Sequence, residues 1–174
     1  MTGGVVPATE SATARGRLTS RERAELLTYA RDTWRSFDKL AFDSGLPADC
    51  MVRDASGWVV PSRQTSPTNI AAYLWSVLAA ERLKIIDHQE ELRRLTRTLA
   101  TLERMERYSG FYFNDLDPRT GAPLAVSPLE GRPRRRLLST VDNAWLAAAL
   151  TMVGNVGPAL RARAGSLLDA MNFG

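Results

Sequence analysis

The sequence has very few residues that build disulfides or metal clusters. Among its 174 residues it contains one cysteine, Cys50, and one histidine, His88. A single cysteine excludes an internal disulfide, and one histidine with one cysteine does not make an ordinary zinc cluster. The sequence therefore predicts no metal site, and we expect no cofactor.

Long apolar runs are also absent, and the net charge is small. The longest apolar run, around Trp145 to Val153, is too short to span a bilayer, and residues 1–18 have no apolar signal core. These features predict a cytoplasmic protein without a membrane partner. The net charge of +4 comes mostly from arginines spread along predicted helices, so no nucleic-acid partner is expected. The run from Arg132 to Arg136 is either an anion-binding stretch or a solvated loop.

The length and the apolar content of 44% suit one domain with its own core. Residues 1–18 mix small and polar residues without periodicity, which predicts a disordered tail followed by a domain over residues 19–174. Five segments carry helical periodicity, at about 19–41, 66–83, 87–105, 141–153 and 159–171. The second and fourth are apolar nearly all round, as inner helices are, whereas the others carry one apolar stripe. Alternating outer and inner helices predict an all-α toroid or solenoid of helical hairpins.

Polar residues lead directly into both inner helices. Thr65 to Asn69 precedes one and Ser139 to Asn143 the other, and corresponding residues lie 74 positions apart (139 minus 65). This spacing suggests a degenerate hairpin repeat, with Thr65 and Asn69 at one entrance. Asp142, Asn143 and Trp145 stand at the other entrance. Asp142 is either a sugar-facing carboxylate or the N-cap of its helix.

Between the third and fourth helices, a loop interleaves aromatic and acidic residues. It reads YSGFYFNDLDPRTG over residues 108–121. A surface loop seldom carries three adjacent rings without burying or using them. Since sugars stack on rings and bond to carboxylates and amides, Tyr112 and Asp115 are candidate binding residues. Asp117 is a second candidate carboxylate or an ordinary turn residue, because Asp, Pro and Gly each favour turns.

Several of these motifs occur together in a known order. They are TSPTNI over 65–70 with YL over 73–74, TLE over 101–103, FY over 111–112 with DPRTG over 117–121, and STVDN over 139–143. In this order the chain resembles the glucoamylase-like family over residues 24–174. That family includes endo-β-1,2-glucanase-like proteins and the glucoamylase-like domain of cyclic β-1,2-glucan synthases. The resemblance implies an (α/α)6 barrel that acts on a glucan at the N-termini of its inner helices.

The resemblance also implies a division of roles. Asp142 and Asn143 would hold substrate hydroxyls, while Tyr112 and Trp145 would stack on sugar rings. Glycoside hydrolysis ordinarily needs two carboxylates, and we name Asp142 first and Asp117 second. The family usually has a Trp-Tyr pair where this chain has Asp115-Leu116.

Five helices do not close the barrel, so we expect the N-terminal half of a partial (α/α)6 toroid. No glutamate of the chain lies in a site-like context, since Glu103 and Glu106 belong to an outer helix and Glu130 to the arginine-rich loop. We therefore expect the general acid outside this chain.

The first hypothesis is a glycoside hydrolase or transglycosylase of β-glucan with little activity alone, completed by a second polypeptide. The alternative is a non-catalytic helical module that binds carbohydrate or protein. Family members are often exported, although no signal is visible at this N-terminus.

Overall fold

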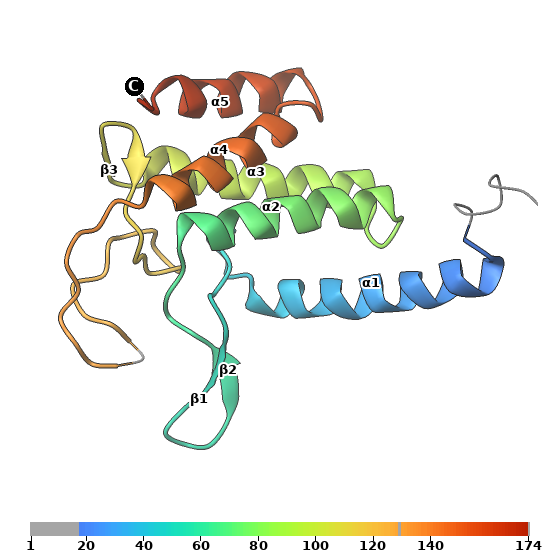
Figure 1. The fold of residues 1–174 in the computed structure, drawn as a ribbon, viewed down its shortest axis with the longest axis horizontal. Helices are drawn as coiled ribbons and strands as arrows, with labels where there is room; N and C mark the ends of the chain where they lie inside the picture. Colours follow the sequence, from blue (N-terminus) through green and yellow to red (C-terminus); the bar gives the residue numbers. More distant parts are fainter. Residues whose placement is uncertain (1–17, 129, 174) are drawn as a thin grey trace, which may run out of the picture.

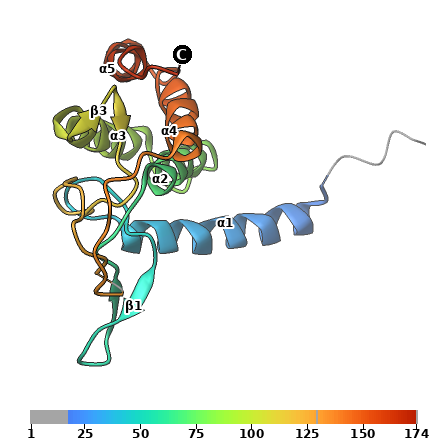
Figure 2. The same cartoon turned by 60° about the vertical axis from the view of Figure 1, so that its left-hand side comes forward.

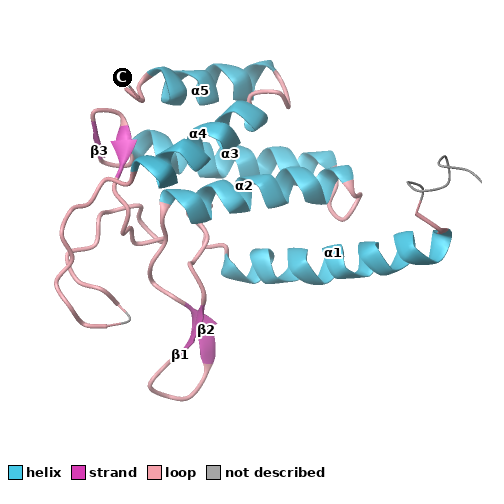
Figure 3. Cartoon of the chain, in the orientation of Figure 1, coloured by secondary structure: helices cyan, strands magenta, loops and turns pink. Residues whose placement is uncertain are grey.

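The computed structural model describes residues 18–128 and 130–173. The predicted disordered tail, residues 1–18, lies outside these residues except for Leu18. Helices dominate the described chain, and the few strands form two short hairpins (Figures 1 and 3). The elements are α1 (Ser20–Leu40), β1 (Met51–Arg53), β2 (Val59–Pro61), α2 (Pro67–Arg82), α3 (His88–Arg104), β3 (Arg107–Tyr108), β4 (Phe111–Tyr112), α4 (Thr140–Val153) and α5 (Pro158–Asp169). The all-α prediction is confirmed.

Local capping residues start the helices where the sequence predicts. Thr19 and Glu22 form a reciprocal capping box at α1. The Ser66 side chain accepts from the backbone of Asn69 at α2, where Pro67 occupies the first helical position. Asp87 caps α3 in the same way. No helix among the described residues is long and apolar enough to cross a membrane.

The inner helices α2 and α4 repeat one burial pattern. The caps Ser66 and Ser139 lie 73 residues apart (139 minus 66), one fewer than the predicted spacing. At this spacing four buried positions coincide: Ile70, Tyr73, Val77 and Ala80 of α2 match Asn143, Leu146, Leu150 and Val153 of α4. The 74-residue register was therefore wrong by one, because Thr65 precedes the cap and pairs its backbone with Leu116 instead.

Outer helices cover the inner pair on one side. The α3 stripe of Leu95, Leu99 and Leu102 is fully buried, and Leu160, Ala164 and Leu167 of α5 join the same core. Trp34 of α1 is buried as well and belongs to the same core. The N-terminal part of α1 extends beyond the other helices (Figure 2). These layers form the partial toroid that the sequence predicts.

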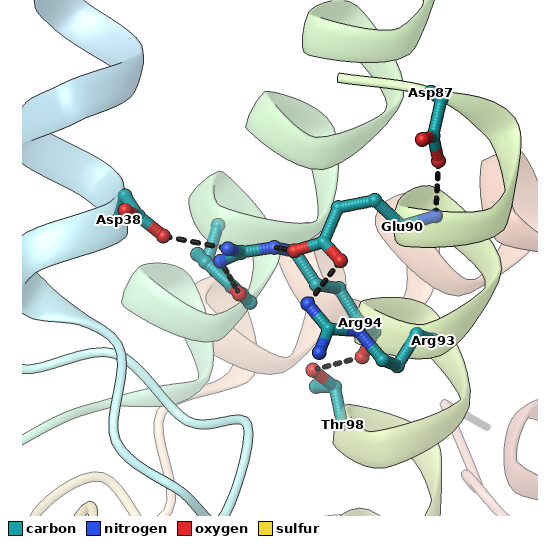
Figure 4. Close-up of polar contacts among 7 residues, drawn as sticks. Asp38, Asp87, Glu90, Arg93, Arg94 and Thr98 are labelled. Carbon is teal, nitrogen blue, oxygen red and sulfur yellow. Dashed lines mark hydrogen bonds and ion pairs between the residues drawn. The ribbon is translucent and has the colours of Figure 1, made fainter.

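Arg94 of α3 ties three helices together (Figure 4). Its guanidinium donates to Oδ1 of Asp38 on α1 at 2.6 Å, to Oε1 of Glu90 at 2.6 Å, and to the hydroxyl of Tyr73 on α2 at 3.1 Å. It also lies 5.0 Å from the centre of the Trp34 ring. Because Arg presents several donors in a fixed plane, one side chain fixes α1 and α2 against α3.

Candidate functional site

The predicted site residues gather around the N-termini of α2 and α4, which lie at the same end of the molecule (Figure 1). We define the inner-helix mouth as the first turns of these helices with the loop residues bonded to them. Its polar members are Asp49, Gln64, Thr68, Asn69, Asp115 and Asp142.

Asp142 lies in the first turn of α4. It is not the N-cap, because the Ser139 hydroxyl holds that role and accepts from the backbone N–H of Asp142 at 3.2 Å. The capping interpretation of Asp142 was therefore wrong. Its Oδ1 instead accepts a hydrogen bond of 2.5 Å from the Thr68 hydroxyl on α2. Asp142 thus lies at the N-terminal end of α4, where a carboxylate interacts favourably with the helix dipole, and the Thr68 hydroxyl holds it in place.

Two further carboxylates are held by the same short segment, residues 64–69. The Asn69 amide donates to Oδ1 of Asp49 at 2.9 Å, and the Gln64 amide donates to Oδ1 of Asp115 at 3.0 Å. With Thr68, the segment thus fixes three carboxylates from three other parts of the chain. In each carboxylate the second oxygen accepts no hydrogen bond from a described residue. Those oxygens can accept from the hydroxyls of a ligand.

Asn143 and Tyr112 lie behind the mouth rather than on it, and both are fully buried. The Asn143 amide accepts from the backbone N–H of Tyr112 at 2.9 Å and donates to the carbonyls of Tyr112 and Ser139 at 3.0 Å. The Tyr112 hydroxyl donates to the carbonyl of Leu102 at 3.0 Å, and burial raises the pKa of Tyr112 to about 12. In this arrangement the two residues fasten β4 to α4 and present no surface to a sugar.

Thr65 and Asp117 also take structural positions. Thr65 is fully buried and its backbone exchanges two hydrogen bonds with Leu116. Asp117 accepts from the backbone and side chain of Arg119, and the side-chain hydrogen bond of Arg119 lowers the pKa of Asp117. The Asp117 carbonyl also closes the turn at Gly121. Asp117 therefore occupies the turn that the Asp-Pro-Arg-Thr-Gly motif favours.

Trp145 is the predicted ring that the structure leaves accessible. Its side chain is 49% exposed, and its ring meets Trp75 edge to face with centres 5.3 Å apart. Such an arrangement fixes one ring and leaves part of its surface free. The two tryptophans join the inner helices beyond the polar mouth.

The polar members of the mouth are half-buried, apart from Asp49, which is exposed. A cavity of about 470 Å³ lies towards the C-terminal ends of α2 and α4, where Trp75, Glu91 and Met152 help to line it. No predicted site residue lines this cavity.

Sequence reasoning missed three members of the mouth. Thr68 lay within a recognised motif, and the correct cap register would have placed it beside Asn69 in the first turn of α2. Asp49 and Gln64 lie in an irregular segment and carry no local signal. Their partners are 20 and 51 residues away in sequence, a separation that no periodicity reveals.

Comparison with known proteins assigns the chain to a family. A family model described as "Protein of unknown function (DUF3131)" matches residues 28–172, which includes every member of the mouth. The chain belongs to the DUF3131 family. Its resemblance to glucoamylase-like proteins is likewise confirmed by the relatives described next.

One curated relative is the cyclic beta-(1,2)-glucan synthase NdvB of Rhizobium meliloti (strain 1021). It is 34% identical over 151 residues, which are 84% of this DUF3131 chain and 5% of the synthase. The chain thus spans a small part of that relative.

Solved structures show the same fold. The endo-beta-1,2-glucanase from Chitinophaga pinensis, in complex with sophorotriose and glucose, superposes with a TM-score of 0.67 at 18% identity. The match covers 86% of the DUF3131 chain and 37% of the glucanase. A beta-1,2-glucanase from Parabacteroides distasonis gives a TM-score of 0.62 at 14% identity, over 88% of this chain and 20% of that one. At these identities the likeness establishes the fold.

Proposed function

We propose that this chain is the N-terminal half of a glucoamylase-like domain and binds a β-glucan at the inner-helix mouth, as part of a glycoside hydrolase or transglycosylase. The observation that carries the proposal is the hydrogen bond between Thr68 and Asp142, which presents a fixed carboxylate at the junction of both inner helices. The names of the synthase and the two glucanases support a β-1,2-linked glucan as the substrate class.

In this proposal the mouth residues have separate roles. Asp142 accepts hydrogen bonds from substrate hydroxyls through its free oxygen and is the first candidate for a catalytic carboxylate. Asp49 and Asn69 form a second polar contact beside it, and Asp115 a third. Trp145 offers its exposed ring surface to a sugar. Tyr112, Asn143 and Thr65, proposed from the sequence as direct contacts, act as the rigid support behind the mouth.

The general acid is proposed to lie outside this chain. A general acid must keep its proton, which requires a raised pKa. Glu103 forms a bidentate ion pair with Arg163, and this pair lowers the pKa of Glu103. Glu106 pairs with Arg136. The Glu103 ion pair favours the charged form of that residue, and Glu106 is tied to a neighbouring arginine, so we expect little turnover by this chain alone.

A second structural unit is proposed to complete the barrel. On α4 a stripe containing Val141, Ala148 and Met152 is exposed, with Val141 at 68%, although the helix is otherwise an inner one. Another inner helix would cover this stripe and enclose the mouth. It would come from the same longer polypeptide or from a second one.

The predicted cytoplasmic location stays a prediction.

Binding of linear β-1,2-glucan by the isolated chain, measured by titration calorimetry, tests the proposal. We expect Asp142→Asn to weaken binding about tenfold or more, since one charged acceptor is lost. Asp32→Asn, which changes an exposed carboxylate paired with Arg35 on α1, should bind like the wild type. Absence of glucan binding, or equal weakening in both variants, would contradict the proposal. A reducing-end assay should detect little turnover.

The exposed α4 stripe also favours the alternative, a non-catalytic module that binds a protein partner. Size-exclusion chromatography separates the two ideas. A module that buries the stripe against itself should elute as an oligomer, and Met152→Glu should return it to a monomer. A glucan-binding monomer whose elution is unchanged by Met152→Glu would count against the alternative.

A further inference from the structure

Trp58 has the most exposed large apolar side chain among the described residues, at 74%. It immediately precedes β2. A single exposed ring is common on protein surfaces. What distinguishes Trp58 is how firmly its backbone is held while its ring contacts water.

The turn that carries Trp58 is fixed by a dense set of hydrogen bonds. Oδ1 of Asp54 accepts from the backbone N–H groups of Ser56 at 2.9 Å and Trp58 at 3.0 Å. The backbones of Asp54 and Trp58 pair at 2.8 Å, and the Arg53 guanidinium donates to the carbonyl of Gly57 at 2.6 Å. Gly57 has φ +85°, which suits glycine. Because the turn is ordered, its backbone has little conformational entropy left to lose when the indole binds a ligand.

The base of the same hairpin is part of the inner-helix mouth. Asp49, just before β1, accepts from the Asn69 side chain and donates its own N–H to the carbonyl of Gln64 at 2.8 Å. Ser62, just after β2, donates to the carbonyl of Cys50 at 2.8 Å. The hairpin projects from the end where α2 begins and leads away from the helices (Figures 1 and 2). The mouth and Trp58 are therefore joined by one short, ordered element.

We propose that Trp58 is an outlying stacking site for the part of a glucan chain that extends beyond the mouth. This inference rests on the proposed function. An indole offers a large, rigid, apolar face with a polar edge, and it adapts to the CH face of a pyranose ring. Only a glucan long enough to extend beyond the mouth reaches the Trp58 ring, so short oligosaccharides do not stack on it. Trp58 thereby gives a preference for polymer over oligosaccharide.

Binding of two probes to the chain tests this inference. Linear β-1,2-glucan is the long probe and sophorotriose the short one. Trp58→Ala should weaken binding of the long probe about three- to tenfold and leave sophorotriose unchanged. Trp58→Phe should retain part of the long-probe affinity, because a ring remains. Tyr29→Ala removes another exposed ring, on α1, and should match the wild type for both probes.

Fluorescence gives a readout that a structural role of Trp58 would not move. The difference in tryptophan fluorescence between the wild type and Trp58→Phe is the emission of the Trp58 ring. Long glucan should protect this emission from acrylamide quenching, whereas sophorotriose should not. Unchanged affinity of Trp58→Ala for long glucan, or equal loss for both probes, would overturn the inference while leaving glucan binding in place. If the wild type binds neither probe, the proposed function fails, and this inference with it.

Discussion

The hydroxyl of Thr68 and Oδ1 of Asp142 lie 2.5 Å apart and join the first turns of the two inner helices. Neither residue is the cap of its helix, since Ser66 and Ser139 satisfy the terminal N–H groups. The hydrogen bond between Thr68 and Asp142 is therefore not needed to start either helix, and its effect is to position the Asp142 carboxylate.

We predict that Thr68→Val weakens glucan binding about three- to tenfold, because Asp142 loses a charge-assisted hydrogen bond and its fixed orientation. Thr68→Ser keeps the hydroxyl and should bind like the wild type. Calorimetry with linear β-1,2-glucan measures the difference. Equal affinities of the valine and serine variants would show that the contact does not position Asp142 for binding.

Arg94 is predicted to hold α1 and α2 against α3. Arg94→Met should lower the free energy of unfolding by about 2–4 kcal/mol, because it leaves Asp38, Glu90 and Tyr73 without their shared donor. Its neighbour Arg93 also pairs with Glu90 but is largely exposed, so Arg93→Met should cost about 0.5 kcal/mol or less. Urea unfolding of the two variants makes the comparison. Similar losses would mean that Arg94 contributes only as an ordinary surface ion pair.

Gly110 and Gly57 allow backbone strain to be separated from packing. Both have positive φ, at +80° and +85°. A Cβ at Gly110 would lie 1.7 Å from the carbonyl oxygen of Ala170, just beyond α5, whereas at Gly57 it would meet nothing within 4 Å.

Gly57→Ala should therefore cost about 1–2 kcal/mol of unfolding free energy, from the left-handed conformation alone. Gly110→Ala should cost about 3 kcal/mol or more, since the β3–β4 turn must also move away from the end of α5. Thermal and urea unfolding check both values. Equal costs would show that this turn and the end of α5 separate easily.

Because Tyr112 is buried, we predict that the free energy of unfolding falls at alkaline pH. Burial raises the pKa of Tyr112 to about 12, whereas an unfolded tyrosine titrates near 10. Between these values the unfolded chain has lost the proton and the folded chain has kept it. Stability from the neutral ring is therefore complete below pH about 10 and falls as pH rises to about 12, by on the order of 2–3 kcal/mol.

Tyr112→Phe should be about 1 kcal/mol less stable near neutral pH, through loss of the hydrogen bond to Leu102. At alkaline pH the free energy of unfolding of Tyr112→Phe should fall less steeply than that of the wild type. The stability difference between the two proteins therefore narrows as pH rises and then reverses. Urea unfolding at several pH values measures this, with Tyr108→Phe as the control for removing an exposed hydroxyl of the same hairpin. Parallel curves for Tyr112→Phe and the wild type would contradict the prediction.

Much of the fold was predictable because its determinants are close in sequence. The capping box of Thr19 and Glu22 and the Ser66-Pro67 pair act within one helical turn. The apolar periodicity that separated inner from outer helices also acts over a few turns. The register of the hairpin repeat was missed by one residue, because the 74-residue spacing aligned Thr65 with Ser139, whereas the two helix caps are Ser66 and Ser139.

The sequence by itself thus determined the helices, their inner and outer positions, and the end of the molecule where the polar residues collect. Only the tertiary structure decided which of those residues reach the surface. It buried Tyr112 and Asn143, assigned Asp117 to a turn, and brought Asp142 to a hydroxyl 74 residues away. The physical reason is that a cap or an apolar stripe is set by neighbours along the chain. The exposure of a side chain and its hydrogen-bond partner are instead set by packing between segments that the sequence places far apart.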